Sequence, residues 1–215
     1  MKRPPGVKVI SLDLIGTILK RDFIDDFWEE AIPGAVAIQR RWPFRRAKRW
    51  VLGEYRTIST SDIRWHLPSY WISRFNLRGG HARLLGHSVG LIREYDDAQT
   101  VLRRMSKDYQ LIISTNVSRD FLIPALLKLK VQFQAAYSSV SDYSLPLKPP
   151  EFYSSIARDL NADPKTILHI GDDPVQDYLN PKRAGLNAIL LDRSGRCKRF
   201  RPIRSLVSID SRLYL

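Results

Sequence analysis

Asp13 directly follows an apolar, β-branched run, VKVISL, and precedes the segment LIGT. A run of this kind is typical of a buried strand. Ligands of parallel sheets bind at the carboxyl ends of the strands. The carboxylate of Asp13 is therefore expected at the position of an attacking nucleophile. An isolated Asp at such a place more often only caps a turn, so this interpretation depends on the segments that follow.

Three further segments carry polar side chains beside strand-like or helix-like stretches. Thr115 and Asn116 follow the apolar stretch QLIIS, and Lys148 precedes the helix-like stretch EFYSSIARDL. The stretch TILHI is followed by GDDPVQD, which contains the carboxylates of Asp172, Asp173 and Asp177. Carboxylates gathered without a fixed cation partner are typical ligands of a hard metal ion such as Mg²⁺. If these segments meet, they form a charged site at one edge of a sheet.

Short strand-like and longer helix-like stretches alternate along most of the chain. We expect strands at residues 7–12, 110–114, 135–138, 166–170 and 187–191, and helices at 97–105, 119–129, 150–160 and 177–184. Alternation of this kind, with right-handed crossovers, predicts an α/β fold with a doubly wound parallel sheet. Such a sheet brings the carboxyl ends of successive strands to one edge, where the candidate residues would lie together.

Residues 20–90 depart from this alternation. They contain no strand-like stretch, and they hold all five tryptophans of the chain, interleaved with arginines. This pattern predicts a helical cap domain of residues 20–90, inserted into a core domain of residues 1–19 and 91–215.

Composition limits the classes of protein to which the chain can belong. Its 215 residues suffice for a buried core, and the single cysteine permits no internal disulfide. No apolar run approaches the roughly 20 residues that span a bilayer, and the start lacks the features of a signal peptide. We therefore expect a soluble, cytoplasmic protein without membrane contact. The formal charge of +13 favours acidic partners such as phosphate esters or nucleic acid.

In order, the segments LDLIGT, IISTN, LKPPEFY and HIGDDPVQD, with AGLNAILLDR downstream, resemble the motifs of the haloacid dehalogenase-like (HAD) hydrolase superfamily. The resemblance implies a Rossmann-like core with the cap inserted after the first motif. It implies that Asp13 attacks a phosphoryl group and forms an aspartyl-phosphate, which water then hydrolyses. Thr115 and Asn116 would hold the phosphoryl oxygens, and Lys148 would neutralise charge on the nucleophile and the phosphate.

The same resemblance implies a magnesium-dependent phosphatase that acts on a small phosphorylated or anionic substrate. The metal would be bound by Asp13, by the backbone carbonyl of Ile15 and by Asp172. Asp177 and Asp173 would orient metal-bound water or the catalytic lysine.

Ile15 departs from the pattern of the family. Phosphatases of this family usually carry an Asp there, which protonates the leaving oxygen and activates water, and isoleucine can do neither. Haloacid dehalogenases also lack this acid, but they generally dispense with magnesium and depart from the Gly-Asp motif, which is intact here as Gly171 and Asp172. We therefore favour phosphoryl chemistry, with a dehalogenase-type hydrolase or a degenerate HAD scaffold that binds a partner without turnover as the alternatives.

The strongest local charge feature runs from Arg40 through Arg49 to Trp50, with six basic residues and no acid. A solvated helix face with aromatic side chains packed inward is the commonest explanation of such a run. A cap surface that attracts a phosphorylated substrate and a nucleic-acid surface are the alternatives, the latter without a supporting motif. His169 lies inside a predicted strand, where a buried hydrogen-bonding histidine is expected rather than a metal ligand.

Overall fold

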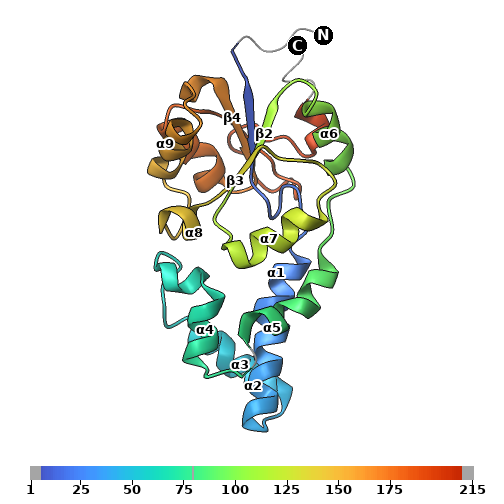
Figure 1. The fold of residues 1–215 in the computed structure, drawn as a ribbon, viewed down its shortest axis with the longest axis vertical. Coiled ribbons are helices and arrows are strands. Elements are labelled where there is room, and N and C mark those ends of the chain that lie inside the picture. Colours follow the sequence, from blue (N-terminus) through green and yellow to red (C-terminus); the bar gives the residue numbers. More distant parts are fainter. Residues whose placement is uncertain (1–5, 79, 210–215) are drawn as a thin grey trace.

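In the computed structural model, which describes residues 6–78 and 80–209, five parallel strands form one sheet in the order β3-β2-β1-β4-β5 (Figure 1). The strands are β1 (Val9–Leu12), β2 (Gln110–Thr115), β3 (Ala135–Ser138), β4 (Ile167–Gly171) and β5 (Asn187–Leu190). β1 lies at the centre, with Val9 opposite Gln110 on one side and Ile167 on the other. Each strand lies within a residue or two of its predicted position. The doubly wound parallel sheet predicted from the sequence is confirmed.

Helices cover both faces of this sheet, as a sheet with two apolar faces requires. Their bounds are α6 (Ala98–Met105), α7 (Arg119–Lys128), α8 (Ser139–Tyr143), η4 (Pro164–Thr166), α9 (Pro150–Asp159), η5 (Pro174–Leu179), α10 (Asn180–Arg183) and η6 (Leu206–Ile209). On one face, Phe152 and Ile156 of α9 pack against Ile112 and Ile167. Burying each such side chain contributes about 1.5–3 kcal/mol. The helix expected at 177–184 begins earlier, at Pro174, with a π-helical turn.

A helical insertion, residues 22–91, lies beyond the carboxyl ends of the strands (Figure 1). Its elements are α1 (Asp22–Asp26), η1 (Phe27–Ala31), α2 (Ile32–Arg40), α3 (Phe44–Tyr55), η2 (Ile63–His66), α4 (Pro68–Arg74), α5 (Gly80–Ser88) and η3 (Val89–Leu91). Trp71 and Phe75 are buried among its helices. No helix in the described parts of the chain is long and apolar enough to cross a membrane.

The two chain segments that connect the insertion to the sheet run side by side, and we call them the neck (residues 18–20 and 93–95). The amide of Lys20 donates to the carbonyl of Arg93, and the amide of Tyr95 donates to the carbonyl of Ile18, both at 2.9 Å. Arg193, downstream of β5, lies 3.8 Å from the centre of the Tyr95 ring. The neck is therefore a two-stranded ribbon fixed to the core at its base.

Candidate functional site

The site is built around an ion pair between Asp13 and Lys148. Asp13 follows β1, and Lys148 lies just before α9, so the folded sheet joins residues far apart in sequence. Both side chains are buried, with 4% of Asp13 and 2% of Lys148 exposed. The Nζ atom of Lys148 lies 2.6 Å from Oδ1 of Asp13. A buried carboxylate and a buried ammonium group held this closely form a charge-assisted hydrogen bond.

Asp177, on η5, holds the same lysine from the other side. Its Oδ1 atom forms an ion pair with Lys148 and lies 3.0 Å from Nε2 of His169. Its Oδ2 atom accepts a hydrogen bond of 2.9 Å from the backbone amide of Asp173. Gly171 leaves the space for this arrangement, because a Cβ atom there would lie 2.3 Å from the carboxyl carbon of Asp177. Since both of its oxygens are engaged, Asp177 is suited to positioning Lys148.

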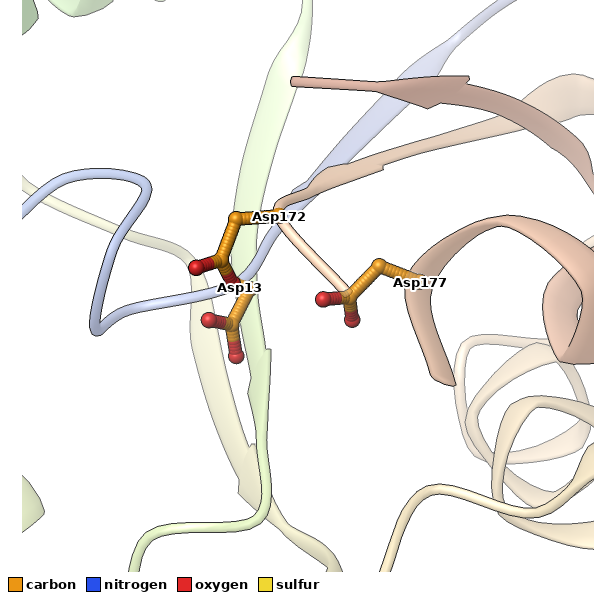
Figure 2. Close-up of side chains that lie close together, drawn as sticks. All are labelled: Asp13, Asp172 and Asp177. Atoms are coloured by element: carbon orange, nitrogen blue, oxygen red, sulfur yellow. The ribbon is translucent and has the colours of Figure 1, made fainter. Parts of the chain in front are cut away.

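Asp172 completes a cluster of three carboxylates. Figure 2 shows the side chains of Asp13, Asp172 and Asp177 close together, and one oxygen of each carboxylate lies within 4.8 Å of the others. Gly16, with a φ of 84°, passes directly beneath this cluster. A Cβ atom at Gly16 would lie 2.1 Å from an oxygen of Asp172, so a side chain at this position would displace that carboxylate.

Burial and mutual repulsion shift the pKa values of the cluster. Burial, with Asp177 and Asp172 nearby, raises the pKa of Asp13 to about 7, although Lys148 opposes the shift. Burial and the charge of Asp177 raise the pKa of Asp172 to about 6. Burial alone would also raise the pKa of Asp177, but Lys148 and His169 hold it well below its ordinary value. The cluster therefore keeps Asp177 ionised and leaves the other two poised to gain a proton or a cation.

The remaining predicted residues occupy separate places. Thr115 is buried at the end of β2, next to β1, and its hydroxyl accepts a 3.3 Å hydrogen bond from the amide of Val117. Asn116 and Ile15 line a cavity between the sheet edge and the helical insertion. The carboxylate of Asp173 caps η5 instead, accepting hydrogen bonds from two backbone amides at 2.7 and 2.8 Å. Its link to the backbone of Lys148 is indirect, through hydrogen bonds of the Gln176 side chain.

Sequence reasoning missed Tyr153 and Ser11, which support the site through hydrogen bonds with His169. The hydroxyl of Tyr153 lies 3.2 Å from Nε2 of His169 and donates to the carbonyl of Gln176 at 2.7 Å. Nδ1 of His169 lies 2.8 Å from the hydroxyl of Ser11. Burial lowers the pKa of His169, so the ring is neutral and acts through hydrogen bonds, as expected from its place in a strand. The one available signal for Tyr153 was a hydroxyl on the apolar face of a predicted helix.

The basic run on α2 and α3 does not line this cavity. Arg40 lies over the rings of Trp42 and Trp50, at 4.9 and 4.2 Å from their centres, and Arg46 lies over Trp42 at 4.4 Å. The arginines are exposed while Ala47 and, in part, Trp50 face inward. This is the solvated face that the sequence pattern most often indicates, and its residues lie outside the cavity wall.

Comparison with known proteins gives one family. Residues 7–185 match the model of the haloacid dehalogenase-like hydrolases. A HAD phosphatase from Thermococcus onnurineus superposes with a TM-score of 0.80 at 20% identity, covering 95% of this chain and 97% of its own. The magnesium-bound YfnB protein of Bacillus subtilis superposes with a TM-score of 0.66 at 16% identity, covering all of both chains.

A 2-haloacid dehalogenase from Pseudomonas syringae pv. tomato superposes with a TM-score of 0.62 at 19% identity, covering 95% of this chain and 97% of its own. No curated protein sequence matches the chain significantly. At these identities the structural likenesses show the fold alone, so the chemistry must be argued from the site.

Proposed function

Because the chain belongs to the haloacid dehalogenase-like hydrolases, we propose that its carboxylate cluster is the active site of a magnesium-dependent phosphatase. The observation that carries this proposal is the buried Asp13, paired with Lys148 at 2.6 Å and facing Asp172 at the carboxyl end of β1. A carboxylate held between a cation and an unpaired acid, beside a cavity, is suited to attack an anion once that anion's charge is offset.

Each residue has a role in this proposal. Asp13 attacks the phosphorus atom and forms an aspartyl-phosphate. Lys148 lowers the repulsion between the nucleophile and the substrate, and Asp177 positions Lys148 through its ion pair. Thr115 and Asn116 hold the phosphoryl oxygens as they pass between leaving group and nucleophile.

The donor set fits a divalent metal ion. All its side-chain ligands are carboxylate oxygens, which a hard cation such as Mg²⁺ prefers. Three carboxylates and the single ammonium group of Lys148 leave a net charge of −2, which a divalent cation offsets. Asp13 and Asp172 would hold the ion with the backbone carbonyl of Ile15. When bound, Mg²⁺ would stabilise negative charge on the phosphoryl group.

Magnesium is expected to raise the melting temperature of the protein. An ion that binds only the folded state stabilises it by about 2.7 kcal/mol at one hundred times its dissociation constant. For a chain of this size the melting temperature rises by about 2–4 °C per kcal/mol. Differential scanning fluorimetry with and without MgCl₂ measures the shift, and beryllium fluoride, which mimics an aspartyl-phosphate, should add to it. Asp172→Asn should lose the shift, whereas the exposed Asp96→Asn should keep it.

The same shift should depend on pH. Asp13 and Asp172 have pKa values of about 7 and about 6, above the 3.8 of an unfolded chain. The metal-free folded state therefore binds more protons than the unfolded state, and its stability falls as pH rises from about 4 to 7. Since Mg²⁺ binds the ionised carboxylates, its effect should be full above pH 7 and shrink below pH 6. An equal shift at pH 5 and pH 8 would contradict the assignment of these ligands.

A screen of phosphomonoesters with magnesium tests the proposed reaction. The expected result is release of inorganic phosphate that requires Mg²⁺ and is inhibited by beryllium fluoride. If folded protein releases inorganic phosphate from none of the esters, the proposal is wrong.

Ile15 favours one second candidate, a dehalogenase-type hydrolase. A halide leaves without a proton, and a 2-haloacid dehalogenase is among the structural neighbours. Chloride release from 2-chloropropionate is the direct assay. Chloride release without phosphate release would replace the phosphatase by this alternative.

The neck supports a division of the chain into two domains. We assign residues 1–19 and 91–215 to the core domain and 20–90 to the cap, because the two connecting segments hydrogen-bond to each other between these regions. The core supplies Asp13, Lys148 and Asp172, and the cap supplies most of the cavity wall.

Ile15→Asp is expected to speed the hydrolysis of alkyl phosphates. The new carboxylic acid would line the cavity two residues beyond the nucleophile and could protonate the leaving oxygen. General acid catalysis contributes up to about 10²–10⁴-fold, and p-nitrophenyl phosphate should gain less because its leaving group needs no proton. The matched control is Ile24→Asp, which adds a carboxylate to the same cavity from α1. A folded, magnesium-binding Ile15→Asp protein without any gain would show that the missing acid does not limit turnover.

A further inference from the structure

The cavity beside the carboxylate cluster has room for the organic part of a substrate. Its volume is about 360 Å³, and a cavity of about 150 Å³ already holds a benzene molecule. On the core side it is lined by Ile15, two residues after Asp13, and by Asn116, which directly follows Thr115. A substrate whose phosphate reaches Asp13 therefore extends its leaving group into this space.

Aromatic rings form much of the cavity wall. The ring of Trp28, on η1, has its centre 5.7 Å from Tyr55, 6.4 Å from Trp65 and 5.8 Å from Phe121. All four side chains line the cavity, and Phe121 belongs to α7 of the core. Aromatic rings prefer edge-to-face or offset-stacked neighbours. A wall of this kind favours a flat aromatic group over a flexible polar one.

The charged groups of the cavity are already paired with one another or with neighbours. Arg21 lies 3.5 Å from Asp25, and Glu29 lies 3.5 Å from Lys48, outside the cavity. Burial lowers the pKa of His66, which also lines the wall. Among the described lining residues, Arg21 is thus the one permanent cation, near the cluster. A second carboxylate or phosphate on the leaving group would find little compensation here.

Ile15 places a further condition on the leaving group. It is buried to 92%, it lines the cavity two residues beyond the proposed nucleophile, and it carries no proton donor. A phenol has a pKa of about 10 and leaves as its anion far more readily than an alkyl alcohol does. The aromatic wall, the paired charges of the cavity and the missing proton donor at Ile15 therefore all favour an uncharged aromatic leaving group with a low pKa.

We propose that the natural substrate is an aryl phosphate, a phosphate monoester of an uncharged phenol-type group that lies against Trp28. This inference rests on the proposed phosphatase function and names its substrate class. An oxygen of Asp13 bonds to phosphorus while the bond between phosphorus and the aryl oxygen breaks. The electron pair leaves with that oxygen, and the phenolate takes a proton from solvent. Water then attacks the aspartyl-phosphate, giving inorganic phosphate and restoring Asp13.

Three esters and one acyl phosphate, measured with Mg²⁺, test the inference: phenyl, 2-naphthyl and hexyl phosphate, and acetyl phosphate. The expected kcat/KM for the two aryl esters exceeds that for hexyl phosphate by about 10²-fold, the lower range of a missing general acid. Acetyl phosphate has a good leaving group but no ring, so its kcat/KM measures phosphoryl transfer without any contribution from binding to the aromatic wall. Phenylphosphonate should inhibit more strongly than methylphosphonate, which measures ring binding without turnover.

Variants of the aromatic wall distinguish binding of the substrate ring from phosphoryl transfer. Trp28→Leu should lower kcat/KM for 2-naphthyl phosphate about tenfold and leave acetyl phosphate within about twofold. Trp65→Leu, at a half-buried position on the same wall, should act in the same direction if Trp28→Leu fails to fold. Trp42→Leu is the matched control, because Trp42 lies on the basic face and not in the cavity.

The two proposals fail in different ways. If none of the four compounds is hydrolysed, the aryl substrate is wrong, and if the wider screen of phosphomonoesters also releases no phosphate, the phosphatase function itself is wrong. If kcat/KM for hexyl phosphate equals that for the aryl esters, the aryl substrate is wrong and the phosphatase function stands. The same holds if Trp28→Leu and Trp65→Leu lower kcat/KM equally for acetyl phosphate and for 2-naphthyl phosphate.

Discussion

Asp13→Asn is expected to lower phosphate release by at least about 10³-fold, because removal of a covalent nucleophile leaves only binding and electrostatic effects. Asn has nearly the same shape as Asp, and its amide oxygen can still accept the hydrogen bond from Lys148. The loss should therefore appear in kcat rather than in the fold. Single-turnover assays with an aryl phosphate measure it, and circular dichroism verifies the structure.

Asp96→Asn is the control for this variant, since it removes an exposed carboxylate outside the cluster. Wild-type turnover by Asp13→Asn would exclude the aspartyl-phosphate. If wild-type protein itself shows no turnover but binds nucleic acid in a salt-sensitive manner, the degenerate scaffold becomes the better description.

Lys148→Met is expected to destabilise the protein by about 3–5 kcal/mol, the cost of removing one partner from a buried ion pair. At about 2–4 °C per kcal/mol for a chain of this size, the melting temperature should fall by roughly 6–20 °C. Met keeps most of the length of the lysine side chain, so the loss of stability arises from the missing charge more than from lost packing. Three carboxylates would then lie together without their ammonium group.

The pH dependence of this loss identifies its cause. Asp13 and Asp177 raise the pKa of Lys148 although burial opposes them, so the lysine is charged throughout the neutral range. Its stabilising effect is fully present below the pKa of an unfolded lysine, about 10.4. As pH falls toward 4, the variant's carboxylates can take up protons and their repulsion ends. The difference between variant and wild type should therefore be smaller at pH 5 than at pH 8.

Lys165→Met, at an exposed position, should change stability by no more than about 0.5 kcal/mol. A Lys148→Met protein as stable as this control would mean that the ion pair contributes nothing to folding. Magnesium should also stabilise Lys148→Met more than wild type, because the variant's cluster carries one more unbalanced negative charge.

The sheet could be predicted from the sequence because its signals are local. The run ending at Leu12 is apolar on both faces, as a central parallel strand must be, and the structure buries all of β1. Asp13 and Asp172 follow the ends of neighbouring strands and Lys148 lies just before α9 at the same sheet edge, so the topology brings the three together. Their mutual distances could not be predicted, since these depend on how Gly16 and Gly171 leave space for neighbouring carboxylates.

The rest depends on contacts between distant segments. Asp173 followed by Pro174 is a helix-start signal in its own right, and it explains why that carboxylate caps η5 rather than joining the cluster. Trp28 and Trp42 both belong to the tryptophan-rich segment 20–90, yet the first lines the cavity and the second lies beneath arginines. Only the folded insertion, in which Trp28 meets Phe121 of the core, separates the two.

The neck has a mechanical consequence. Two independent linkers would let the helical insertion translate and rotate freely, but hydrogen bonds between residues 18–20 and 93–95 join them into one ribbon. The Arg193 guanidinium ties its base by donating to the carbonyl of Thr17 at 2.8 Å and pairing with Asp97. A ribbon clamped at one end bends and twists but does not slide. Any opening of the cavity would thus be a swing about the neck rather than a sliding of the insertion across the sheet edge.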